Sequence, residues 1–95
     1  MLNIFEIADK TGRKIRLTQE RWSHITQEHP EVVSLEEVKD TLTSPLKIKS
    51  SKYSPEDVNY YYRFDKDKKK YLMVAVKYLN GDGFVITVYY LRNLK

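Results

Sequence analysis

The alternation of hydrophobic and polar residues predicts strands at the start of the chain and again over its second half. Residues 3–7 and 14–17 alternate around the turn signal Asp9-Lys10-Thr11-Gly12, so we expect a hairpin there. After residue 45 the pattern predicts four more strands. They span residues 46–53, 58–65, 71–79 and 84–91, with a charged hairpin loop at 66–69 and a turn signal at 80–83.

Two segments between these strand regions have helical spacing instead. Thr18 is a suitable N-cap for a helix over 19–28, and Pro30 ends it. Ser34 and Glu37 form a capping box that opens a second helix to about residue 43.

This order of elements predicts an α+β domain. We expect an N-terminal hairpin, two helices, and then a four-stranded, largely antiparallel sheet, all in a single domain over residues 1–95. The strands at 71–79 and 84–91 are apolar on both faces, so we expect them at the centre, covered by the helices on one side.

Composition narrows the class of protein. The 95 residues contain no cysteine, which excludes a disulfide scaffold, a thiolate metal site and a cysteine nucleophile. No apolar run approaches the roughly 20 residues of a membrane span, and the start does not resemble a signal peptide. We therefore expect a soluble cytoplasmic protein that does not bind a membrane.

Charge is unevenly distributed along the chain. The net charge of the chain is +4. It is the sum of a net charge of −2 over residues 1–45 and of +6 over residues 46–95. A basic half suggests an anionic partner, and the tyrosines interleaved with these lysines favour RNA. An ordinary solubilising surface is the alternative.

Both histidines lie in one short segment, residues 21–30, together with Arg21. His24 and His29 could supply the acid and the base of one site. Their i, i+5 spacing separates them on a helix and no third ligand is near, so we expect no metal site and no cofactor. The structural alternative is that His29 is favoured by the helix C-terminus and His24 pairs with Glu28.

Two strands add further candidates. Thr87 and Tyr89 are two residues apart, so they share a face, on which the alternation also places Val85. Thr87 could bind a phosphate. Alternatively, a threonine could stand here only because threonine favours β-strands. On another strand Arg63 could bind a phosphate and Tyr61 could stack on a base, although such a face is more often solvated.

Several blocks together resemble the phage-Barnase-EndoU-Colicin-RelE-like (BECR-like) nuclease-fold group of toxins. The resemblance covers about residues 13–92 and is strongest in a W-x-H-I-x(3)-H-P block and a threonine on the last strand. The blocks are Ile15-Arg16-Leu17-Thr18, Arg21-Trp22-Ser23-His24-Ile25, Glu28-His29-Pro30-Glu31, Ser44-Pro45 and Phe84-Val85-Ile86-Thr87-Val88-Tyr89.

The resemblance implies a metal-independent endoribonuclease of toxin type, cleaving RNA, tRNA among its candidates, by attack of the 2′-hydroxyl on the adjacent phosphate. It implies acid and base roles for His24 and His29, a phosphate contact for Thr87 and assistance from Tyr89. Arg21 and Arg63 would stabilise charge, and together with Tyr61, the candidate for stacking on a base, they are the expected substrate-binding residues. An acidic antitoxin or immunity protein would be the natural partner of the basic half.

Two other classes stay open. The same charge and fold could serve a non-catalytic module that binds nucleic acid or protein. The strand at 46–53 could also be an exposed edge that recruits a partner, so the protein could be a monomer or a weak dimer.

Overall fold

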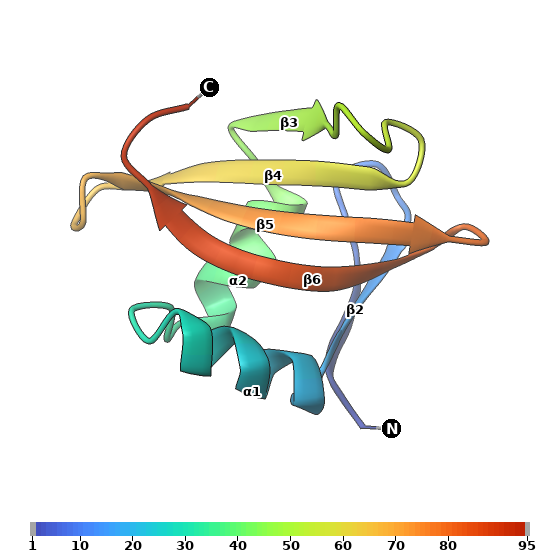
Figure 1. Ribbon diagram of the computed structural model, residues 1–95, viewed down its shortest axis with the longest axis horizontal. Coiled ribbons are helices and arrows are strands. Elements are labelled where there is room, and N and C mark those ends of the chain that lie inside the picture. Colours follow the sequence, from blue (N-terminus) through green and yellow to red (C-terminus); the bar gives the residue numbers. More distant parts are fainter. Residues whose placement is uncertain (1, 95) are drawn as a thin grey trace.

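The computed structural model describes residues 2–94 and contains one sheet and two helices (Figure 1). Both predicted helices are confirmed, including their N-caps at Thr18 and Ser34. No helix among the described residues is both long and apolar enough to cross a membrane. In chain order the elements are β1 (Asn3–Ala8), β2 (Lys14–Thr18), α1 (Gln19–Glu28), α2 (Leu35–Thr43), β3 (Lys47–Ser50), β4 (Val58–Asp65), β5 (Lys70–Leu79) and β6 (Asp82–Leu91).

The predicted four-stranded, largely antiparallel sheet is wrong, because the sheet has six strands and is mixed. Its order is β1-β2-β6-β5-β4-β3. The N-terminal hairpin does form, but it also joins the sheet through a parallel pairing of β2 with β6. The α+β class holds, while the hairpin is a continuation of the main sheet.

Gly83 explains why the hairpin can dock against β6. Ile15 lies opposite Gly83 in the parallel pairing. A Cβ atom at Gly83 would come within 2.8 Å of the Tyr78 ring and 3.0 Å of the Ile15 side chain. The first distance is shorter than real Cβ contacts and the second is tighter than most of them, so glycine allows this close approach without a shift of its neighbours.

Both helices lie on the same face of the sheet, where they bury the main hydrophobic core (Figure 1). Ile25 of α1 and Val38 and Leu42 of α2 are each at most 2% exposed. They pack with inward-facing strand residues such as Leu17 and Val74. These residues therefore form a core that is closed to solvent.

The opposite face of the sheet carries no helix, and we call it the open face. A second, smaller cluster lies on it, formed by three buried residues with partly buried neighbours that include Tyr60 and Tyr89. The three buried residues are Tyr62, Met73 and Ala75, and Leu94 packs against the same cluster.

A bulge in β6 decides which residues reach the open face. Thr87 pairs with Ala75 and Val85 pairs with Val76, so Ile86 is an extra residue in the ladder. Val85 consequently packs in the helix-side core, and the prediction that it shares a face with Thr87 is wrong.

Strand β3 is shorter than the predicted strand over residues 46–53. The Ser51 hydroxyl accepts hydrogen bonds from the backbone N–H groups of Tyr53 (3.2 Å) and Ser54 (3.3 Å). The Ser51 backbone N–H still donates to the Val58 carbonyl at 2.9 Å, and the side chain turns the chain away from the sheet after this residue.

Candidate functional site between helix α1 and strand β6

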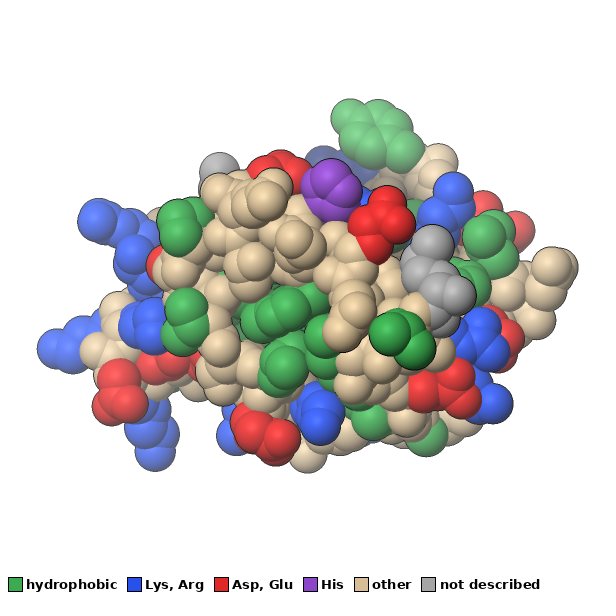
Figure 2. Space-filling view, turned by 90° about the horizontal axis from the view of Figure 1, so that it is seen from below, with side chains coloured by type: hydrophobic (Ala, Val, Ile, Leu, Met, Phe, Trp, Pro, Cys, Tyr) green, Lys and Arg blue, Asp and Glu red, His purple; other side chains and the backbone are tan. Residues whose placement is uncertain are grey.

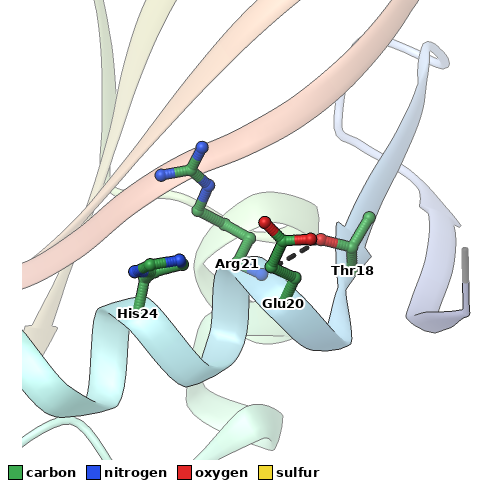
Figure 3. Close-up of a pocket in the computed structure, with 4 residues that line it drawn as sticks. All are labelled: Thr18, Glu20, Arg21 and His24. Carbon is green, nitrogen blue, oxygen red and sulfur yellow. Dashed lines mark hydrogen bonds between the residues drawn. The ribbon is translucent and has the colours of Figure 1, made fainter.

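Arg21 and His24 project from the same side of α1 because they are three residues apart (Figure 3). Both side chains are exposed, and with Thr18 and Glu20 they line a cavity of about 380 Å³. The Thr18 hydroxyl accepts a hydrogen bond from the Arg21 backbone N–H at 3.1 Å, which fixes the first turn of the helix. The local sequence thus places a cation and an imidazole side by side.

Arg21 also lines a second hollow, which connects α1 to the sheet. This hollow, of about 230 Å³, is bordered by Arg16 of β2 and by Phe84 to Ile86 of β6. Arg16 is already paired with Glu6 (2.8 Å) and Asp82 (3.3 Å). Arg21 makes no ion pair within residues 2–94, so it is the cation available to an anionic ligand at this surface.

His29 lies at the other end of α1, where it is the C-cap residue. Its ring centroid is 5.3 Å from the ring centroid of Tyr89 on β6, at an interplanar angle of 40°. Its Nδ1 atom is 3.9 Å from a carboxylate oxygen of Glu31. The structure therefore brings together two residues that lie sixty positions apart in the sequence.

Thr87 shares the open face with Tyr89, because the two pair with Ala75 and Met73 of β5. It is partly exposed. Within residues 2–94 its hydroxyl has no hydrogen-bond partner, so it can donate to a phosphate oxygen.

Two predicted substrate-binding residues lie elsewhere. Tyr61 is fully buried on the helix-side face, so its ring offers no surface to a base. Arg63 faces the C-terminal end of α2, where its guanidinium donates to the Ser44 carbonyl at 3.2 Å. Both point toward the helices because this side of β4 is covered, so we remove them from the candidate site.

Tyr61 has a structural partner instead. The buried Asp9 carboxylate accepts hydrogen bonds from the hydroxyls of Tyr61 and Tyr78, the latter at 2.8 Å. Burial by itself would raise the pKa of Asp9. The hydrogen bonds from Thr11, Tyr61 and Tyr78 outweigh burial and hold this pKa below its ordinary value. This network ties the turn after β1 to strands β4 and β5.

The predicted site did not include the β4 residues whose side chains lie on the open face. Tyr60 and Tyr62 lie on the open face, where Lys49 and Lys47 of β3 are their paired neighbours. Three consecutive tyrosines show no alternation in hydrophobicity, so only the register with β3 identifies the outer two.

Figure 2 shows the molecule from the α1 side. A histidine lies near the rim of this view, with acidic and basic side chains beside it, and lysine or arginine side chains project at the left end, where Figure 1 places the β4–β5 turn. Among the residues that the structure describes, no group of three or more His, Asp or Glu side chains is placed to hold a metal ion.

The chain matches no protein-family model, no curated protein and no solved structure.

Proposed function

We propose that this protein is a metal-independent endoribonuclease whose active site lies between α1 and β6. The observation that carries the proposal is the meeting of His29 with Tyr89 at one end of α1, the helix on which Arg21 and His24 line a cavity nearer the other end. The resemblance of the W-x-H-I-x(3)-H-P block and the last-strand threonine to toxin nucleases supports the same assignment.

These residues suit cleavage by an internal nucleophile. One histidine removes the proton of the RNA 2′-hydroxyl, and this oxygen forms a bond to the adjacent phosphorus. The bond from phosphorus to the 5′ oxygen breaks, and the second histidine donates a proton to that oxygen. The products are a 2′,3′-cyclic phosphate and a 5′-hydroxyl end.

The other residues stabilise charge and orientation. Arg21 lies where it can neutralise the extra negative charge that develops on the phosphate in the transition state. Thr87 donates to a non-bridging oxygen, and the Tyr89 ring holds the imidazole of His29 in place.

The test is cleavage of total RNA and of tRNA in excess chelator by wild type, His24→Ala and His29→Ala. We expect at least one histidine variant to lose roughly 10²- to 10⁴-fold in rate. Gln27→Ala is the control, because Gln27 is exposed on the same helix. Intact RNA with folded wild-type protein, or equal rates in all four proteins, would contradict the proposal.

A second function, RNA binding without cleavage, is favoured by the open face, which offers partly exposed aromatic rings beside lysines. In that case the histidine variants bind RNA like wild type and no product appears. Binding that weakens steeply with salt identifies phosphate contacts in either case.

The cellular role that we propose is a cytoplasmic toxin held in check by an acidic antitoxin or immunity protein. It rests on the resemblance and on the basic half of the chain. Induced expression of wild type should arrest growth, whereas the double variant His24→Ala/His29→Ala should not. Equal growth of both would count against a toxin.

A further inference from the structure

A third hollow lies on the open face at the β3 edge of the sheet, from which β4 and β5 separate it from β6. It has a volume of about 350 Å³ and is formed by β3, β4 and the segment that follows β3. Its lining includes Lys49, Ser51, Lys52, Tyr53, Tyr60 and Tyr62. Nothing in the proposed cleavage step uses these residues.

The tyrosine and lysine side chains that line the hollow suit a planar, anionic ligand. Tyr60 of β4 is partly exposed and Tyr53 is 95% exposed, so both rings are accessible in the lining, whereas Tyr62 is only 8% exposed. Aromatic rings in a strand bind bases by stacking, at little cost in conformational entropy. Lys49 and Lys52 are the charged residues of the lining and no acidic residue belongs to it, so a phosphate beside the stacked base is favoured.

The strand register joins this hollow to the candidate active site. Lys49 pairs with Tyr60, Tyr60 with Ala75, and Ala75 with Thr87, which forms one row across the open face. The adjacent row runs from Lys47 through Tyr62 and Met73 to Tyr89. Three inter-strand spacings separate the ends of each row, about 14 Å in total.

We propose that the hollow binds one base of a single-stranded RNA whose chain crosses the open face along these two rows. Its scissile phosphate would lie at Thr87, and this half of the proposal rests on the proposed function. Duplex RNA does not fit, because its bases stack on one another and present no free face to a tyrosine.

The test is fluorescence anisotropy with a labelled single-stranded RNA of about twelve nucleotides and with the matching duplex. All proteins carry His24→Ala/His29→Ala, so that no cleavage disturbs the binding curve. Tyr53→Ala, Tyr60→Ala and the double variant Lys49→Gln/Lys52→Gln are compared with this background.

Matched controls lie outside the hollow. Phe64→Ala removes a 43% exposed ring at the far end of β4, and Lys66→Gln/Lys69→Gln removes two exposed cations in the β4–β5 turn. Circular dichroism confirms that each variant is folded, and Tyr53→Ala cannot disturb the core because that ring is almost wholly in solvent.

We expect Tyr53→Ala and Tyr60→Ala to weaken single-strand binding roughly tenfold each. For the Lys49/Lys52 double variant, the association constant should depend less steeply on salt. The plot of its logarithm against the logarithm of the salt concentration should be shallower by about 1.4, since each single-strand phosphate contact contributes about 0.7. The controls should lie within about twofold of the background, and the duplex should bind more weakly.

Three results would overturn the proposal. They are unchanged single-strand affinity in the tyrosine and lysine variants, equal binding of the duplex, and loss of a dimer in light scattering for Tyr53→Ala, which would assign the face to a second copy. A failure here leaves the cleavage test with His24 and His29 untouched. Conversely, a tyrosine-dependent single-strand affinity without cleavage would overturn the enzyme and keep the binding subsite.

Discussion

The tyrosines of the two sheet faces occupy opposite chemical environments. On the helix-side face, Tyr61 and Tyr78 donate to the Asp9 carboxylate and Tyr90 donates to Glu37. On the open face, Tyr60, Tyr62 and Tyr89 belong to a cluster without a helix. Within residues 2–94, none of these three hydroxyls bonds to a carboxylate.

This difference separates structural tyrosines from ligand-binding ones. A buried hydroxyl needs an acceptor, and a carboxylate on a neighbouring element both satisfies it and fixes that element in place. The partly exposed rings of Tyr60 and Tyr89 have no such role and are available to a ligand, whereas Tyr62 is buried in the cluster. Substitutions on the helix-side face should therefore change stability, and those on the open face should change RNA binding.

The largest stability effect is expected for Asp9→Ala. The variant leaves the hydroxyls of Tyr61 and Tyr78 buried without their acceptor, at a cost of about 3 kcal/mol in the free energy of unfolding. Urea unfolding followed by circular dichroism measures it. Asp67→Ala, at an exposed position in the β4–β5 turn, is the control and should stay within about 0.5 kcal/mol. A similar cost for both variants would show that the Asp9 network is dispensable.

A pair of neighbouring substitutions compares the two faces directly. Tyr61→Phe removes a buried hydroxyl and should cost about 1.5 kcal/mol, because Asp9 loses a donor. Tyr60→Phe, one residue away on the open face, should cost less than about 0.5 kcal/mol. Thermal unfolding of both proteins is the measurement. Equal costs would show that the hydroxyls on the two faces do not differ in their contribution to stability.

Acid should destabilise the helix-side network specifically. The pKa of Asp9 is lower in the folded protein than its ordinary value. Its contribution is therefore fully present above the unfolded pKa, near 3.9, and is lost as pH falls through the folded pKa. Unfolding curves between pH 6 and pH 2.5 should show this loss in wild type. Asp9→Ala should have a flatter profile below about pH 4, and parallel profiles would contradict the assignment.

Glu37 should show the opposite pH dependence and the smallest effect. Burial and then the neighbouring Asp65 carboxyl raise the pKa of Glu37. Its contribution is fully present below the unfolded pKa, near 4.3, and is lost as pH rises through the folded pKa. Glu37→Gln stays neutral and keeps an acceptor for Tyr90, so its stability at pH 7 should be within about 0.5 kcal/mol of wild type or above it. A larger loss at pH 7 than at pH 4 would contradict this sign.

The helices and the part of the candidate site on α1 were predictable because their signals are local. Thr18 and Ser34 cap the helices that follow them, and the i, i+3 spacing of Arg21 and His24 places both on one side of α1. The site residue Tyr61 was assigned wrongly for the opposite reason. Adjacent tyrosines carry no alternation, so their directions depend on which side of β4 the helices cover.

By itself, the sequence determined the helices, the hairpins and the placing of Arg21 and His24 on one helix with His29 directly after it, since each depends on residues within a turn or two of one another. Only the tertiary structure decided three further features. These are the parallel pairing of β2 with β6 at Gly83, the bulge at Ile86 and the contact of His29 with Tyr89. Each joins distant parts of the chain, and its free energy comes from packing that no local pattern encodes.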